Sequence, residues 1–373
     1  MKVDVVVIGS GLSGVMAALR ASSYGKKVVV IRKGWGATAL SSGAFEISPN
    51  PLLPQAFELL KKWVSLRIQG SYEENHLFLS QTGEFKKAAF AMESHFLDFR
   101  TIGRKKVLVL GIFSPVIPRP AKDLNIVCDL VPLHASDVNL LPPVLAKRLD
   151  HPEEVKKLAQ AIKTKFNLQS YAALFLPPIL GFEFFSDIRR ECETILGLPV
   201  YEMLGGSHSV PGLRLQKALE SALRKANIPI IQGKVSSFSH EKKKIMSVTV
   251  NEEEVLAHHF ILATGKFFSG GLYKGVDAFQ ETVFGLPLFY ENKKINETPI
   301  RDLVDPSFSK KQPLFQCGVK TNENLVPVNE YGEVVYENLR ACGTVLSGVD
   351  PYRGGNCFGV QVVTGYRAGE IMT

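Results

Sequence analysis

The sequence predicts an α/β fold: a three-layer, Rossmann-like nucleotide-binding domain that is interrupted by a second, inserted α/β domain. Three observations predict it. An apolar strand at residues 3–8 runs into a G-x-G-x-x-G turn at 9–14 and then into an alanine-rich helix. A later strand, 257–262, ends in Ala-Thr-Gly, and a last strand and helix follow residue 335. The pieces of one domain are therefore spread over the beginning, middle and end of the chain.

The glycine turn has the order that a nucleotide pyrophosphate requires. Gly9 allows the tight turn, Gly11 lets the backbone approach the phosphates, and Gly14 lets the helix pack against the strand. The N-terminus of the helix adds free N–H groups and a partial positive charge. We therefore expect residues 9–14 to bind a phosphate group.

The elements after the turn continue the pattern of a βαβ unit. A helix is expected at 12–24, closed by Gly25, and a second strand at 27–31. The chain then enters a loop of small residues at 34–44. A cluster of prolines near residue 50 marks the end of this first segment of the domain.

The middle of the chain predicts the inserted domain. Residues 55–99 are expected to be mostly helical. After them, apolar strands alternate with helices, which is typical of a small, mainly parallel sheet. The expected strands are 106–111, 125–131, 172–176 and 200–204, and the expected helices are 142–165 and 183–196.

The first domain resumes with an amphipathic helix from residue 211, followed by strands and the Ala-Thr-Gly segment. We predict five segments, of which three form the nucleotide-binding domain. Those three are 1–48, 207–274 and 335–373; the other two are the inserted α/β domain, 49–206, and a second-domain or capping segment, 275–334.

Composition narrows the class of protein. The 373 residues hold 44 Lys and Arg against 36 Asp and Glu, a net charge of +8. This excess fits a solvated basic surface, or attraction to an anionic substrate, a phosphate-bearing cofactor, an acidic partner or an anionic membrane face. No basic tract is interleaved with aromatic residues, so the sequence does not favour nucleic-acid binding.

Cysteine usage and hydropathy indicate a cytoplasmic protein. The five cysteines form no C-x-x-C pair, which fits a reducing compartment and predicts no metal site. The first strand begins at residue 3, so we expect no signal peptide. The longest uncharged run, 167–182, is too short to span a bilayer. We therefore expect any place at the inner face of the membrane to come through a partner.

Several motifs resemble a known family. The Ala-Thr-Gly strand, the small-residue loop and a terminal G-T-x-x-x-G resemble flavoproteins of the fumarate-reductase and succinate-dehydrogenase type. Closer matches resemble the B subunits of anaerobic glycerol-3-phosphate dehydrogenase. Residues 212–216 fit G-[IL]-R-L-Q, and residues 338–351 fit N-L-x-A-x-G-[ST]-V-L-x-G-x-D-P. The segment HFILATGKFFSGGL at 259–272 resembles F-x-x-L-A-x-G-x-F-F-S-G-G-L, and FQCGVKT at 315–321 resembles Q-x-x-G-V-x-T. The resemblance implies an FAD/NAD(P)-binding type of flavoprotein fold, and it is loose over 50–200.

Arg32 raises the question of which nucleotide binds. At the end of the second strand a dinucleotide-binding domain normally places Glu or Asp, which accepts hydrogen bonds from the adenosine ribose. A guanidinium has only donors. Three interpretations stay open: FMN, whose single phosphate approaches Arg32; an NADP-type 2′-phosphate site at Arg32 and Lys33; or FAD held by backbone groups beside a solvent-facing Arg32. The resemblance favours FMN, with FAD as the alternative.

The resemblance and the glycine motif together predict the cofactor contacts. The terminal helix is expected to point its N-terminus at the flavin ring, and Asp350 to bond the ribityl chain. The candidate cofactor-binding residues are Gly9, Ser10, Gly11, Leu12, Ser13, Gly14, Arg32, Lys33, Ser41, Ser42, Gly43, Val235, Ala263, Thr264, Gly265, Gly343, Asp350, Gly354, Gly355 and Asn356.

Catalytic residues are less well defined by the sequence. Oxidation of glycerol 3-phosphate requires a cation for its phosphate group and a base near C2. The candidates are Arg214, Arg353 and His208, and of these only Arg214 lies on a position that matches the family. Each also has a structural explanation, since Arg214 would serve equally to fix its helix.

The function that the resemblance implies is that of a flavoprotein subunit in a glycerol-3-phosphate:quinone oxidoreductase, with dihydroxyacetone phosphate as product. Expected partners are a dehydrogenase (the A subunit) and a membrane-associated iron–sulfur protein, and this chain would relay electrons towards quinone. Two alternatives stay open. One is a self-contained FAD-dependent oxidoreductase of the fumarate-reductase type that acts on another small anion. The other is a non-catalytic scaffold stabilised by its flavin.

Overall fold

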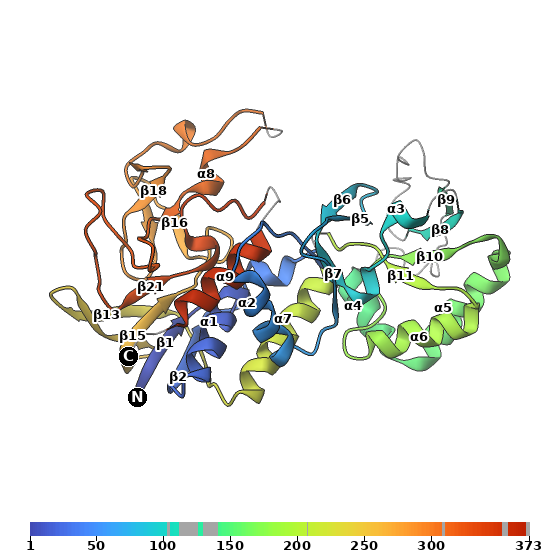
Figure 1. The fold of residues 1–373 in the computed structure, drawn as a ribbon, viewed down its shortest axis with the longest axis horizontal. Helices are drawn as coiled ribbons and strands as arrows, with labels where there is room; N and C mark the ends of the chain where they lie inside the picture. The colour runs from blue at the N-terminus through green and yellow to red at the C-terminus, as the bar shows by residue number, and fades with distance from the viewer. Residues whose placement is uncertain are drawn as a thin grey trace. The chain divides into compact units, whose positions relative to one another are not determined.

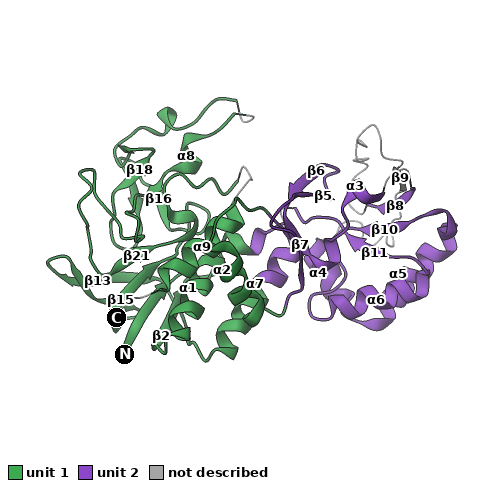
Figure 2. Cartoon of the chain, viewed as in Figure 1, with its two compact units in different colours: residues 1–38, 46–65, 216–373 green, residues 39–45, 66–215 purple. Residues whose placement is uncertain are grey.

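The computed structural model describes residues 1–102, 105–111, 126–129, 141–206, 208–307, 310–352 and 357–370, with the backbone alone for 126–129. Contacts divide the chain into two compact units (Figure 2). Unit 1 comprises 1–38, 46–65 and 216–373, and unit 2 comprises 39–45 and 66–215. The predicted fold class, a Rossmann-like domain interrupted by an inserted α/β domain, is confirmed. The boundaries of the five segments into which the sequence divides the chain stay a prediction.

A seven-stranded sheet forms the centre of unit 1. Its order is β12-β2-β1-β15-β14-β13, with β21 also paired to β15. The pairs β1–β2, β2–β12, β1–β15 and β15–β21 are parallel, and β13 and β14 form an antiparallel hairpin. The strands are β1 (Lys2–Ile8), β2 (Val28–Arg32), β12 (Ile230–Gln232), β13 (Val235–Glu241), β14 (Lys244–Val250), β15 (Glu253–Leu262) and β21 (Leu339–Ala341).

Three helices of unit 1, α1 (Leu12–Ser23), α2 (Leu53–Trp63) and α9 (Cys357–Ala368), pack against one another. Helix α1 lies against α9, and α2 contacts both (Figure 1). The contact between α1 and α9 is close because of glycine: a Cβ on Gly365 would lie 2.4 Å from the Ser13 carbonyl oxygen, and one on Gly369 2.4 Å from that of Ala17. Helix α7 (Val210–Lys225) contributes residues to both units.

The remainder of unit 1 is built from short elements between β15 and β21. They are β16 (Leu272–Lys274), β17 (Phe279–Glu281), β18 (Leu288–Tyr290), β19 (Lys293–Lys294), α8 (Pro313–Gln316) and β20 (Gly318–Val319). A short 3-10 turn, η5 (Gly343–Val345), follows β21 and lies next to α9.

Unit 2 holds a four-stranded parallel sheet of order β11-β10-β8-β9. The strands are β8 (Val107–Leu110), β9 (Ile126–Asp129), β10 (Ala173–Leu176) and β11 (Val200–Glu202). Apolar side chains of α5 (Pro152–Lys165) and α6 (Phe185–Leu196) form one core with it, which includes Leu108, Leu158 and Leu174. The predicted inserted α/β layer is thereby present.

Two sequence predictions about helices were wrong. The region 55–99 is helical only in α2, in the short 3-10 turn η2 (Glu93–His95) and in the single turn α3 (Phe99–Ile102). The rest contains β4 (Ile68–Gly70), β5 (His76–Leu79), β6 (Phe85–Ala88) and β7 (Phe90–Met92). A tight turn at Gly83, with φ of +81°, reverses the chain where a helix would have to continue.

The predicted single helix at 142–165 is two helices, α4 (Pro142–Arg148) and α5. Pro152 begins the second, because its missing N–H and its ring are tolerated only in the first turn of a helix.

Candidate functional site

The glycine turn between β1 and α1 has no room for side chains. Gly9 has φ of +117°, and a Cβ there would lie 2.2 Å from the Ala263 carbonyl oxygen. A Cβ on Gly14 would lie 1.9 Å from the Gly9 carbonyl oxygen. The backbone of the Ala-Thr-Gly segment therefore lies directly against the turn. Residues 9–14 and 263–265, which the sequence predicts as one site, are brought together.

The N-terminus of α1 keeps donors for an anion. The Leu12 N–H donates to Thr38 Oγ1 at 3.0 Å, and the first turn contains no acidic residue. The next amides, Ser13 and Gly14, have no carbonyl four residues earlier within the helix to bond. Together with the helix dipole they favour negative charge at the turn.

Two buried acceptors border the same turn. Thr264 Oγ1 and Gln216 Oε1 are shielded from solvent and have no hydrogen-bond partner in the part of the chain that the structure describes. The Gln216 amide donates from Nε2 to the Ser10 carbonyl at 3.1 Å. Because a buried polar atom without a partner is costly, these atoms fit the hydroxyls or amide of a bound nucleotide. The residues present thus fit the phosphate-bearing portion of a nucleotide cofactor.

The strand β21 adds a third segment to the site. Gly343 has φ of +77°, and a Cβ on it would lie 2.2 Å from Ser13 Oγ. Asp350 accepts a hydrogen bond from the Tyr352 N–H at 2.9 Å. Its contact with the ribityl chain stays a prediction. Arg353, Gly354, Gly355 and Asn356 lie outside the described residues. Val235 is buried in β13, paired with Val250, and no described contact joins it to the glycine turn.

Lys266 is a polar residue of this region that the sequence reasoning missed. It directly follows Gly265, is 2% exposed, and donates from Nζ to the carbonyls of Phe315 and Cys317 at 2.8 and 2.6 Å. Burial lowers the pKa of its amine to about 7, against the attraction of Cys317 and Asp350, which raises it. The lysine holds the segment that contains β20 against the end of β15.

The cysteines near Lys266 are protonated at neutral pH. Burial raises the pKa of the Cys317 and Cys357 thiols to about 11 each. Burial likewise raises the pKa of Cys342 to about 12. Since the thiolate is the reactive form, these residues do not act as nucleophiles. Cys317 and Cys342 are buried apolar groups, and Cys357 is half-buried.

Arg32 is held by an ion pair. One Nη donates to Glu220 Oε1 of α7, and Nε donates to Gln232 Oε1 at 3.0 Å. Its side chain is 17% exposed, so it does not face solvent freely. Lys33 is exposed, and its carbonyl accepts from Gln232 Nε2 at 2.6 Å. The carboxylate next to the guanidinium opposes the phosphate interpretations of Arg32, because it neutralises the cation that they require.

The predicted loop contacts Ser41, Ser42 and Gly43 belong to unit 2. Ser209 Oγ donates to the Ser41 carbonyl, and the Gly205 N–H donates to the Ser42 carbonyl at 2.8 Å. His95 lies against Gly43, where a Cβ would be 2.6 Å from the imidazole. The loop is therefore held in one conformation by its own unit, and its contact with the flavin stays a prediction.

His95 is a neutral imidazole. Burial lowers its pKa below the ordinary value. Its Nδ1 donates to the Glu202 carbonyl at 3.0 Å, since a carbonyl can only accept, and Nε2 has no partner among the described residues.

The catalytic candidate Arg214 is engaged in a buried ion pair. Its guanidinium donates to both oxygens of Glu202 and, from Nε and Nη2, to the Gly181 carbonyl at 2.9 and 2.6 Å. Burial raises the pKa of the Glu202 carboxyl, but attraction and hydrogen bonds from Arg214 outweigh it and leave the pKa below its usual value. The geometry gives Arg214 a structural role. His208 is exposed two residues before α7, and its catalytic role stays a prediction.

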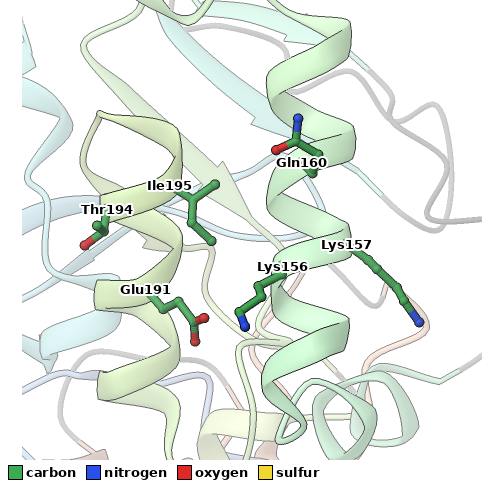
Figure 3. A pocket seen from close by; sticks show the side chains of 6 residues that line it. All are labelled: Lys156, Lys157, Gln160, Glu191, Thr194 and Ile195. Atoms are coloured by element: carbon green, nitrogen blue, oxygen red, sulfur yellow. The ribbon is translucent and has the colours of Figure 1, made fainter.

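A surface hollow of about 680 Å³ lies between α5 and α6 in unit 2 (Figure 3). Its polar lining includes Lys156 and Glu191, whose side chains point towards one another, while Lys157 points away. It contains no glycine turn and none of the residues predicted to contact a cofactor. We therefore place the candidate nucleotide site at the glycine turn of unit 1.

Comparison with known families decides the class of cofactor. The model of the FAD binding domain family matches residues 4–101 and 187–360, most of the chain. The chain belongs to the FAD binding domain family. It is therefore a flavin-binding protein of the oxidoreductase class. FMN, which the sequence analysis favours over FAD, is not confirmed.

Curated relatives cover the whole length of this family member. It is 26% identical to the B subunit of anaerobic glycerol-3-phosphate dehydrogenase from Pectobacterium atrosepticum, over 99% of this chain and 98% of that protein. It is 27% identical to the protein of the same name from Histophilus somni, with the same coverage. The resemblance to B subunits that the motifs predict is thereby confirmed.

Among solved structures, the 3-ketosteroid Δ1-dehydrogenase of Sterolibacterium denitrificans matches with a TM-score of 0.47 and 11% identity, covering 99% of this chain and 98% of that one. Within the described residues, no helix combines the length and the apolar character that crossing a membrane requires.

Proposed function

We propose that this chain is the FAD-carrying subunit of a glycerol-3-phosphate:quinone oxidoreductase. The observation that carries the proposal is the glycine turn, packed against Ala263–Gly265, in a chain that resembles B subunits from end to end. The flavin would supply the redox chemistry when bound. FAD takes the place of FMN in the proposal because the matching family is described by FAD.

The chain's own residues favour electron relay over direct binding of the substrate. Arg214 is the family-matching candidate for a phosphate clamp, and its donors are taken up by Glu202 and Gly181. The turn at 9–14 and the buried acceptors Thr264 and Gln216 would hold and orient the cofactor. We propose that a partner dehydrogenase, the A subunit, oxidises the substrate, and that a membrane-associated iron–sulfur protein takes the electrons on.

Anaerobic absorbance spectroscopy of the purified flavin-loaded chain tests this. Glycerol 3-phosphate is added to the chain alone and then with its dehydrogenase partner, and succinate serves as a control anion. We expect flavin bleaching only with the partner present. Bleaching of the isolated chain by either anion would instead favour a self-contained oxidoreductase, and none under any condition would favour a scaffold.

A further inference from the structure

Helix α7 supplies the carboxylate that is missing at the end of strand β2. A dinucleotide-binding domain needs an acceptor at this place for the ribose hydroxyls of the adenosine half. Arg32 stands there and has no acceptor. The structure brings Glu220, on α7, into an ion pair with Arg32, so a carboxylate is present at the end of β2 after all.

The contacts of Glu220 occupy only one of its oxygens. Oε1 accepts from Arg32, from the Trp35 indole N–H, and from Gln216 Nε2 at 3.5 Å. Oε2 accepts no hydrogen bond from any described residue. The residue is 9% exposed, so its carboxylate is fixed in place with one oxygen unused. A fixed anionic acceptor of this kind suits a hydroxyl donor and repels a phosphate.

The same face of α7 connects Glu220 to the glycine turn. Gln216 lies one helical turn before Glu220, and it donates to the Ser10 carbonyl while its own Oε1 stays buried without a partner among the described residues. Trp35, whose indole N–H donates to Glu220 Oε1, is 46% exposed. Aromatic faces stack on nucleobases. Hydrogen bonds thus link the phosphate turn, the two acceptors Gln216 and Glu220, and an aromatic side chain in that order. Phosphate, ribose and base follow one another in the same order in adenosine diphosphate.

We propose that Glu220 accepts the adenosine ribose hydroxyls of FAD, with Arg32 and Trp35 as positioning residues. The inference rests on the proposed FAD cofactor and deepens it, because it names the residue that selects FAD over FMN and over a 2′-phosphorylated nucleotide. Glu220 does this from α7, where Glu or Asp at the end of β2 would ordinarily do it.

Equilibrium binding to the flavin-free full-length chain tests the proposal, with FAD and FMN followed by fluorescence quenching. Glu220→Gln keeps the size of the side chain and removes its charge. We expect the variant to lose at least tenfold in affinity for FAD and to keep its affinity for FMN. Glu58→Gln, an exposed change on α2 of the same unit, is the matched control and should alter neither.

A second measurement separates recognition from folding. ADP and 2′,3′-dideoxy-ADP compete with FAD on the wild-type chain and on Glu220→Gln and Glu220→Asp. The wild type should prefer ADP by about tenfold or more, as a hydrogen bond to a charged group predicts, and Glu220→Gln should lose this preference. Equal losses for FAD and FMN, or a preference for ADP that persists in Glu220→Gln, would overturn the assignment.

The mass of the cofactor released from the wild-type chain keeps the two proposals distinguishable. If FMN is released, the proposed FAD cofactor fails and the role of Glu220 fails with it. If FAD is released but Glu220→Gln binds it as the wild type does, only the role of Glu220 is refuted.

Discussion

Burial of the Lys266 amine near the site has an electrostatic cost, which is seen in its lowered pKa. Its Nζ is held by two backbone carbonyls, and no described carboxylate hydrogen-bonds it. Hydrogen bonds to carbonyls favour the ammonium form, whereas burial disfavours it, and burial prevails. At neutral pH the clamp between β15 and β20 is therefore an amine that is only partly protonated.

The stability of the protein should depend on pH through this lysine. The pKa is about 7 in the folded chain and 10.5 in the ordinary state. Between these values the unfolded chain binds a proton that the folded chain does not, so the free energy of unfolding should rise with pH. Urea titrations at pH 7 and pH 9.5 measure this. Lys266→Met should flatten the rise, while the exposed Lys293→Met should leave it unchanged; an unaltered slope in Lys266→Met would contradict the prediction.

The buried pair Arg214–Glu202 makes a second prediction at this scale. Arg214→Met leaves a buried carboxylate without its partner, which should cost about 3–5 kcal/mol of unfolding free energy. The control Lys156→Met removes an exposed amine that pairs with Glu153 and faces Glu191, and it should cost less than about 1 kcal/mol. Chemical denaturation measures both.

Acidification should distinguish the wild type from the Arg214 variant. Because the folded pKa of Glu202 is lowered, the stability that it contributes is present above about 4.5 and is lost as the pH falls through the folded value. In Arg214→Met the unpaired carboxyl should protonate more easily, so its destabilisation should shrink as the pH falls towards 4. A loss in Arg214→Met that does not depend on pH would argue against a buried charge as its cause.

At the scale of elements, the β1–turn–α1 segment shows why some structure could be predicted from the sequence. Its glycines, its apolar strand and its helix are neighbours in the chain, so their spacing alone specifies the geometry. The hairpins at 68–92 could not be predicted in the same way. Their strands are three or four residues long, and their pairing depends on tertiary partners such as β3 (Ala44–Phe45), which pairs with β7.

The candidate site, too, could be predicted from the sequence only where its residues belong to a local motif. The meeting of Gly9 with Ala263 follows from known motifs, whereas Arg32 and Glu220 are 188 positions apart and no local pattern joins them. Lys266 escaped notice for a different reason: a lysine is ordinarily exposed, and only the fold reveals that this one is buried.

The glycine turn between β1 and α1 leads to a testable prediction about this element. Gly9→Ala places a methyl group 2.2 Å from the Ala263 carbonyl oxygen at a positive φ. We expect it to cost more than about 2 kcal/mol and to abolish flavin binding, since the turn must open to admit the side chain. Gly25→Ala is the matched control. Gly25 has φ of +75° with nothing within 4 Å of an added Cβ, so that change should cost roughly 1 kcal/mol and keep the flavin.

The flavin absorbance of each purified variant, together with its denaturation midpoint, checks this pair. Wild-type flavin content in a folded Gly9→Ala chain would show that the turn is not the phosphate site.

For the whole molecule, the proposed cofactor should act as a stabiliser. A ligand that binds only the folded state at a hundredfold excess over its Kd adds about 2.7 kcal/mol. We therefore expect the melting temperature of the chain to rise with FAD concentration, as followed by circular dichroism. Gly9→Ala, where it folds, should melt at a temperature independent of FAD; a shift equal to that of the wild type would count against the site.

The net charge of +8 belongs to the molecule as a whole, and the sequence allows only a broad interpretation of it. The structure connects some of this charge with particular roles, because Arg32, Arg214 and Lys266 are all withdrawn from solvent. Charges that are used inside the protein do not attract partners at its surface. The remaining lysines and arginines are the ones to examine for contacts with other subunits.

The packing of α1 against α9 also determines the order in which the protein can be made. Gly365 and Gly369 must lie against Ser13 and Ala17 before the first helix is fully covered, yet they come far later in the chain and are therefore translated much later. Most of unit 2 is one continuous stretch, 66–215, and can collapse while translation continues. Helix α1 is therefore covered only once α9 has been translated, and we expect a nascent chain stalled before α9 to emerge without flavin.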